Sequence, residues 1–289
     1  MTIKVISWNI GTRLAAWKQL LQMNADVALL QEVGNGLANE ITDVKTGSRG
    51  HWDSHVWNSR WYEGRFPNLL NRWPMVVKLS DRVEVEWFKQ VSPISLPDED
   101  EIAVSGIGTI AAARIIPQDT LPFIVVSMYA RWKEPHPSVK SSWIYSDGSA
   151  HSIISDMSAF IGSMDASTHR ILAAGDLNIC FGTVDEAANG FAVRERTVWD
   201  RMAALGLEFL GPQYPFGRKA EPTPSYLSPE TRNVPTYHSV KGSPTTAENQ
   251  LDYAFASRGF HEGVRVRALN DVECWGASAH CRLLIEVDA

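Results

Sequence analysis

Seven polar side chains of the kinds that hold metal ions or move protons stand at or near the ends of apolar segments in this sequence. They are Asn9, Glu32, Tyr129, Asp176, Asn178, Asp252 and His280. Mg²⁺ prefers carboxylate and carboxamide oxygens, and a histidine beside a carboxylate suits the charge changes of phosphoester cleavage. Any one of them alone could simply cap a strand or satisfy a buried backbone group. Their coherence as a set favours metal-assisted chemistry at a phosphoester.

Other chemistries find little support. Cys274, His280 and Cys281 lie close together, but their spacing matches no zinc pattern and a fourth ligand is missing. The segment 106–111 spells GxGxxA inside an apolar β-branched run with no helix after it, so it is not a dinucleotide-binding turn. The sequence contains neither a Walker A motif nor GxSxG.

The apolar segments that must position these side chains alternate between strand-like and helical patterns. Two strands, at 3–10 and 26–33, enclose a helix that Thr12 can cap and that carries Leu14, Trp17, Leu20 and Leu21 at helical spacing. Further helices are predicted at 152–164 and 193–205, and long loops at 45–72 and 208–235. Further strands are predicted at 75–79, 82–88, 102–116, 123–129, 170–174, 250–256, 264–269 and 282–287. The consecutive strands with short turns predict antiparallel hairpins, so we expect mixed sheets in an α/β protein.

Composition limits the protein class. The chain has 289 residues, 44% of them hydrophobic and 21% charged, which is typical of a globular protein and not of a disordered or coiled-coil chain. Its net charge of −6 argues against wrapping duplex DNA with a broad basic surface. Three cysteines cannot form a disulfide framework, so we expect reduced thiols and a cytoplasmic protein. The start, MTIKVISWNI, is neither a signal peptide nor a membrane anchor. No linker or repeat interrupts the chain, and we predict a single domain over residues 1–289.

Five short motifs, in this order, resemble those of the endonuclease/exonuclease/phosphatase superfamily, which includes DNase I-like nucleases, exonuclease III and abasic-site endonucleases. The motifs are Trp8-Asn9-Ile10, Leu30-Gln31-Glu32, Gly175-Asp176-Leu177-Asn178, Gln250-Leu251-Asp252-Tyr253 and Ser278-Ala279-His280. The resemblance covers residues 3–287. It implies a four-layer αββα sandwich of two packed mixed or antiparallel sheets, with the site at one rim. It also implies a Mg²⁺ cofactor, with Mn²⁺ as a possible substitute.

The resemblance assigns a role to each matched residue. Glu32 resembles the metal-binding glutamate, and Asn9 resembles the asparagine that orients metal and phosphate. Asp176 is similar to the aspartate that aligns or deprotonates the attacking water, and Asn178 to its phosphate-binding neighbour. The remaining matches are His280, which contacts the scissile phosphate, Asp252, which holds that histidine, and Tyr129, a weaker match to a phosphate-contacting tyrosine.

Two positions depart from the family pattern. Gly11 stands where abasic-site endonucleases often carry an aspartate, which affects the subfamily rather than the activity. Ala279 stands where the family has the aspartate of Ser-Asp-His, so one oxygen of the metal and phosphate site is missing. Either Ala279 is an introduced inactivating substitution or the site is naturally weakened. The first interpretation is favoured because the rest of the set is intact.

Substrate clues come from aromatic and basic residues near the predicted rim. Five tryptophans interleaved with arginines fall in the segment 52–87, and Trp61 lies on its predicted loop. Aromatics beside arginines can stack bases and neutralise phosphates, although Trp73 and Trp87 also suit a core. Arg131 and Tyr237 are further candidates for substrate contact, and Arg131 could equally lie in a solvated turn. The histidines without a matched role, among them His51, are expected at the surface.

These features predict a Mg²⁺-dependent phosphodiesterase, and a nuclease acting on DNA in particular. No amphipathic or apolar insertion of the kind that binds membranes is present. Two alternatives stay open. One is a phosphatase or phosphodiesterase of small phosphorylated molecules, and the other is a non-catalytic relative that binds nucleic acid through an impaired site.

Overall fold

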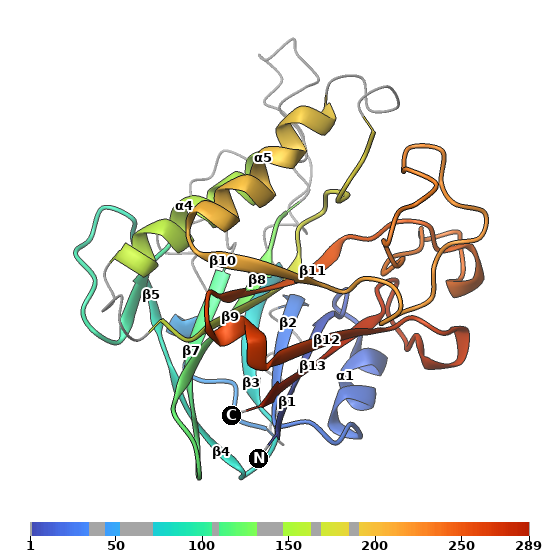
Figure 1. Cartoon of the computed structure of the whole chain (residues 1–289). Helices are drawn as coiled ribbons and strands as arrows, with labels where there is room; N and C mark the ends of the chain where they lie inside the picture. The colour runs from blue at the N-terminus through green and yellow to red at the C-terminus, as the bar shows by residue number, and fades with distance from the viewer. Residues whose placement is uncertain are drawn as a thin grey trace, which may run out of the picture.

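Two large β-sheets pack face to face in the structure (Figure 1). The computed structural model describes residues 2–34, 44–52, 72–105, 110–131, 147–162, 169–184 and 191–288. The five-stranded sheet has the order β12 (Val264–Leu269), β13 (Arg282–Asp288), β1 (Thr2–Asn9), β2 (Val27–Gly34) and β3 (Arg72–Lys78). The six-stranded sheet has the order β10 (Leu207–Gly211), β11 (Asp252–Ser257), β9 (Ile171–Asp176), β8 (Phe123–Tyr129), β7 (Ile110–Pro117) and β4 (Val83–Trp87). Each large sheet contains one parallel pair among antiparallel ones, β1–β2 and β8–β9 respectively.

Helices cover the outer faces of both sheets. Helix α1 (Leu14–Leu21) packs its Trp17 and Leu20 against the outward side chains of β1, whereas α4 (Asp147–Gly162) and α5 (Phe191–Ala204) lie across the six-stranded sheet (Figure 1). A third apolar cluster fills the space between the sheets. The predicted four-layer αββα sandwich is therefore confirmed. None of the helices in the described ranges is long and apolar enough to cross a membrane.

The alternation of side chains along each strand explains why polar residues gather at one rim. On β1, Ile3 and Val5 point into the core between the sheets, and two-residue steps lead from them to Asn9. On β9, Leu172 and Ala174 face the same core, and the next inward position is Asp176. The inward rows of β8 and β11 likewise include Tyr129 and Asp252. Each inward row thus carries a polar side chain at the same rim.

Gly175 allows the strand that carries Asp176 to approach its neighbour closely. A Cβ atom at this position would lie 1.9 Å from the Met128 carbonyl oxygen of β8, which no side chain can tolerate. The parallel register pairs Met128 with Gly175 and Tyr129 with Asp176. The glycine therefore fixes the spacing of two candidate site residues.

Several local predictions were wrong. Arg13, and not Thr12, directly precedes α1. Thr12 has a φ of 59° and does not cap the helix. The strands β3 and β4 do not form a hairpin, since β3 ends one sheet and β4 pairs with β7 in the other. The predicted strand 102–116 is two strands, with β6 (Glu101–Ala103) pairing in parallel with β5 (Lys89–Val91). The predicted loop 208–235 begins inside β10.

The segment 44–52 also differs from the surface loop that we expected. His51 and Trp52 are buried, and Trp52 contacts Trp73 in the cluster beneath α1. The His51 ring joins β3 to the residue between β4 and β5, because its Nε2 accepts the Val76 amide proton at 3.2 Å and its Nδ1 lies 3.1 Å from the Phe88 carbonyl oxygen. These two partners replace the water that a surface histidine would have.

Candidate active site

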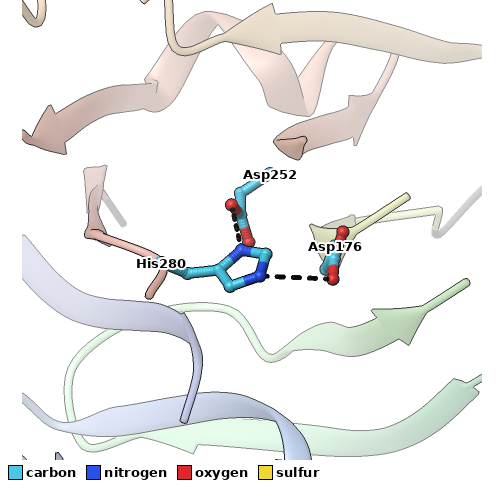
Figure 2. A group of neighbouring side chains, drawn as sticks. All are labelled: Asp176, Asp252 and His280. Atoms are coloured by element: carbon cyan, nitrogen blue, oxygen red, sulfur yellow. Dashed lines mark hydrogen bonds and ion pairs between the residues drawn. The ribbon is translucent and has the colours of Figure 1, made fainter. Parts of the chain in front are cut away.

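His280 lies between two aspartates from neighbouring strands (Figure 2). Its Nδ1 donates to Asp252 Oδ2 at 2.9 Å, and its Nε2 lies 3.9 Å from Asp176 Oδ2. The second distance is longer than a hydrogen bond, so Nε2–H is available to another acceptor. Burial opposes the charged ring, but the carboxylates of Asp252 and Asp176 outweigh it and raise the pKa of His280 to about 9. The ring is therefore an imidazolium at neutral pH.

Asp176 is completely buried and held by two asparagines. Its Oδ2 accepts hydrogen bonds from Asn9 Nδ2 at 2.9 Å and from Asn178 Nδ2 at 3.0 Å, and its Oδ1 accepts the Asn178 amide proton at 2.8 Å. Burial raises the pKa of the Asp176 carboxyl, against the positive charge of His280 and with the negative charge of Asp252. A fixed carboxylate with a raised pKa is suited to accept a proton.

Asn178 reaches Asp176 because the backbone reverses directly after β9. It has a φ of 51°, a left-handed conformation that asparagine tolerates better than most residues. Its side chain also donates to the Ala130 carbonyl oxygen at 2.7 Å, at the end of β8. The Gly-Asp-Leu-Asn motif thus ties two strand ends together at the rim.

The segment that carries His280 is fastened to β1 and to residues 236–238. Trp8 donates from its indole to the His280 carbonyl oxygen at 2.9 Å, and Ser278 Oγ donates to the Asn9 carbonyl oxygen at 2.6 Å. The Tyr237 ring lies 4.8 Å from the His280 ring. Ala279 lies between these anchors, and its carbonyl oxygen accepts the His238 amide proton at 3.0 Å. A carboxylate at position 279 would therefore add an anion to a backbone that is already placed.

Asn9 connects this half of the site to Glu32. One hydrogen on its Nδ2 points to Asp176, and the same nitrogen lies 3.2 Å from Glu32 Oε1. Its Oδ1 accepts the Gly11 amide proton at 3.0 Å. Glu32 stands at a bulge in β2 with a φ of 54°, and its other oxygen, Oε2, is paired with the Arg72 guanidinium.

Two arginines flank Glu32 and Tyr129. Arg131 donates to the Arg72 carbonyl oxygen at 2.8 Å and stacks on Trp73 with 5.0 Å between the guanidinium carbon and the ring centre. It is buried, which lowers its pKa to about 10, and its Nε and Nη1 have no hydrogen-bond partner among the residues that the structure describes. The alternative of a solvated turn at Arg131 is therefore wrong. Burial, with the negative charge of Glu32, raises the pKa of Tyr129 well above its usual value, so its hydroxyl stays protonated.

Two groups of side chains could hold a divalent cation. Single atoms of Asp176, Asp252 and His280 lie within 4.8 Å of one another, and the carboxylate of Glu32 beside Asn9 offers hard oxygen ligands. In the first group, three hydrogen bonds already engage Asp176 and the Asp252 bond engages Nδ1 of His280, which suits proton transfer. Glu32 is also more open, with 14% of its side chain exposed. The hard carboxylate oxygens of Glu32 and its greater exposure therefore favour Glu32 over the first group for a divalent cation.

Most of the predicted residues come together at this rim. The structure gathers Asn9, Glu32, Tyr129, Asp176, Asn178, Asp252, His280 and Tyr237, and places Arg131 behind Arg72. Trp61 and Trp57 lie outside the described residues, and so do Trp132 and Lys133, which directly follow Arg131. The assigned roles of all these residues stay predictions.

The sequence did not predict the contacts of three residues that shape the site. Thr236 Oγ1 accepts the amide protons of Leu251 and Asp252, at 2.9 and 3.1 Å, and so sets the start of β11. Trp8 was read only as part of a motif. Arg72 was noted as one of several arginines, and nothing in the local sequence indicates that it pairs with Glu32.

Comparisons with known proteins support the fold. No family model matches the sequence, and a search of curated proteins finds no match. Among solved structures, the AP endonuclease LMAP from Leishmania major is 16% identical with a TM-score of 0.64, over 100% of this chain and 88% of that one. The catalytic domain of Xenopus laevis APE2 is 16% identical with a TM-score of 0.62, over 98% and 91%.

A third similar structure is the 3′–5′ exonuclease NExo from Neisseria meningitidis, at 16% identity and a TM-score of 0.60, over 99% of this chain and 100% of that one. A NExo structure from Neisseria is also described as a 3′ phosphatase bound to a product DNA hairpin. The fold that the resemblance to the endonuclease/exonuclease/phosphatase superfamily implied is thereby confirmed. At these identities the likeness concerns architecture, and the chemistry must be argued from the site.

Proposed function

We propose that this chain, which has the fold of the endonuclease/exonuclease/phosphatase proteins, is a Mg²⁺-dependent phosphodiesterase that hydrolyses DNA. The observation that carries the proposal is the position of His280 between Asp252 and Asp176, with Asn9 linking Asp176 to Glu32. This arrangement offers a base, a cationic hydrogen-bond donor and a carboxylate for a hard cation within one rim. Each of the three can accelerate the hydrolysis of a phosphodiester.

Each residue contributes a separate part of the reaction. Asp176 orients a water molecule and takes its proton as the new bond to phosphorus forms, while the bond from phosphorus to the leaving oxygen breaks. The leaving oxygen then takes a proton from solvent. The imidazolium of His280 donates from Nε2 to a non-bridging phosphate oxygen, and Asp252 keeps that ring charged and correctly turned.

The other polar residues hold the phosphate and the cation. Glu32 and Asn9 would bind Mg²⁺ (or Mn²⁺), which supplies charge neutralisation on the phosphate oxygens when it is bound. The protonated hydroxyl of Tyr129 can donate to a phosphate oxygen, and Asn178 lies beside Asp176 for the same purpose. Tyr237, against the ring of His280, is placed to contact the group next to the scissile phosphate.

DNA is the proposed substrate for two reasons. Trp57 and Trp61 stand beside Arg60 and Arg65 in the sequence, and the fold is shared with proteins named as an AP endonuclease and as an exonuclease. A phosphomonoesterase activity is the second candidate, because a NExo structure is described as a 3′ phosphatase. The two differ only in whether the phosphorus carries one ester bond or two.

A substrate panel tests the proposal. Single-stranded DNA, duplex DNA, DNA with one abasic site, DNA with a 3′ phosphate, and inositol phosphates are incubated with the protein in Mg²⁺ or in EDTA. We expect Mg²⁺-dependent cleavage of at least one internal DNA phosphodiester. Release of inorganic phosphate alone, from any of these compounds, would make the protein a phosphatase. DNA binding without turnover of any compound, by the wild type and by Ala279→Asp, would make it a non-catalytic relative.

A further inference from the structure

Both oxygens of the Glu32 carboxylate are already engaged. Asn9 Nδ2 lies 3.2 Å from Oε1, and the Arg72 guanidinium pairs with Oε2. Arg72 is the first residue of β3, which is paired with β2 beside the bulge that carries Glu32. A divalent cation that binds Glu32 through Oε2 therefore competes with the guanidinium, because the two positive charges repel each other at that oxygen.

The backbone of Arg72 is fixed, whereas its side chain is free to exchange. The main chain is held by pairing with Gly34 in the sheet and by the hydrogen bond from Arg131 to the Arg72 carbonyl oxygen at 2.8 Å. Trp73, the next residue, is completely buried beneath Arg131. The Arg72 side chain itself is 29% exposed. Displacement from Glu32 thus needs rotation of one side chain and no movement of a strand.

A displaced Arg72 would remain beside the place where the substrate phosphate binds. Arg72 pairs with Glu32, and Asn9 links Glu32 to Asp176, so the Arg72 side chain lies among the residues proposed to receive the phosphate and its cation. A guanidinium binds phosphate oxygens well because its N–H groups form a planar fork. A phosphate in the site would therefore stabilise the released side chain.

We propose that Arg72 is a counter-ion that pairs with Glu32 in the absence of a divalent cation. When the cation binds Glu32, the Arg72 side chain moves to the substrate phosphate. Cation and phosphate consequently bind with positive cooperativity, since each favours the same position of Arg72. Arg72 is a positioning residue for the cation and a binding residue for the substrate. The inference rests on the proposed function, in which Glu32 receives the cation.

Direct titration with Mn²⁺ tests this without any measurement of catalysis. Isothermal titration calorimetry gives the Mn²⁺ Kd of the wild type and of Arg72→Ala, each with and without dimethyl phosphate as an inert phosphodiester. Without the phosphate, we expect Arg72→Ala to bind Mn²⁺ about tenfold more tightly or better, within the range typical of coupled sites. Dimethyl phosphate should tighten Mn²⁺ binding by about fivefold or more in the wild type and have little effect in the variant.

Arg82→Ala is the matched control. Arg82 also forms an ion pair with an acidic residue, Asp26, at 3.2 Å. Asp26 directly precedes β2, so this ion pair lies at the opposite end of that strand from Glu32. We expect its Mn²⁺ affinity to equal that of the wild type. Thermal melting checks folding, and Arg72→Gln replaces Arg72→Ala if the alanine variant does not fold.

Two outcomes would overturn the inference, and they can be told apart. If Mn²⁺ binds and Glu32→Gln abolishes the binding, but Arg72→Ala binds no more tightly than the wild type, Arg72 is only a structural brace. If Mn²⁺ binding is absent or unaffected by Glu32→Gln, the cation site of the proposed function is wrong and the inference falls with it.

Discussion

The charge of His280 depends on Asp252, and the substitution Asp252→Asn tests that dependence. The carboxylate oxygen lies 2.9 Å from His280 Nδ1, and both residues are buried. Burial alone would lower the pKa of the ring, and Asp252 is the strongest of the groups that raise it to about 9. The asparagine keeps the size of the side chain, and the Thr236 hydrogen bonds reach the backbone, so the variant should fold.

The magnitude follows from the two pKa values. The difference between about 9 and the ordinary 6.5 corresponds to roughly 3 kcal/mol in favour of the imidazolium. At pH 7.5, a ring with the higher pKa is about 97% charged and a ring with the ordinary pKa about 9% charged. Loss of the Asp252 carboxylate therefore lowers the fraction of enzyme with a charged His280 ring by about a factor of ten. Any population of the wrong ring tautomer would lower the activity further.

The assay is the ratio of kcat/KM between the variant and the wild type from pH 5.5 to 9, with the His280 titration followed by NMR. Below pH 6.5 the variant ring regains its proton, so the activity ratio should rise toward one as the pH falls. The wild-type titration should lie near 9 and the variant titration near or below 6.5. A ratio that does not change with pH, together with an unmoved His280 titration, would refute the reasoning.

Two further predictions concern His51 and Ala279. His51 is buried and its pKa is lowered to about 4, so its neutral form contributes stability that is present above pH 6.5 and lost as the pH falls through about 4, up to roughly 3 kcal/mol. His51→Gln should flatten that part of the pH dependence of the unfolding free energy in urea, and an unchanged dependence would contradict this. Ala279→Asp should raise Mg²⁺ affinity and phosphodiesterase activity by about ten- to a hundredfold, because it adds an oxygen ligand at a placed backbone. Equal activity of both forms on every phosphoester would show that position 279 has no part in the reaction.

Much of the site could be predicted because its residues continue patterns that the sequence displays. The two-residue alternation that puts Ile3 and Val5 in the core also puts Asn9 at its rim, and the same holds for Leu172, Ala174 and Asp176. Short-range motifs of this kind depend on backbone periodicity, which is local. The resemblance of five motifs then implied the four layers and the rim that holds the site.

The rest depends on contacts between segments far apart in the chain. The pairing of Arg72 with Glu32 joins residues separated by a long segment, and no periodicity links them. His51 was expected at the surface because its neighbours follow no strand or helix pattern, yet Val76 and Phe88, both distant in the chain, provide its hydrogen-bond partners. The burial of Arg131 on Trp73 is also a tertiary contact, between β3 and the end of β8.

The most direct test of the central claim is single-turnover cleavage of a DNA phosphodiester in Mg²⁺ by the wild type and by Asp176→Asn. Asparagine keeps the shape at position 176 but cannot accept the proton of the attacking water. The account predicts cleavage that EDTA abolishes, and a loss of about 10²- to 10⁴-fold in the variant. Cleavage by Asp176→Asn at the wild-type rate, or wild-type cleavage that persists in EDTA, would contradict it.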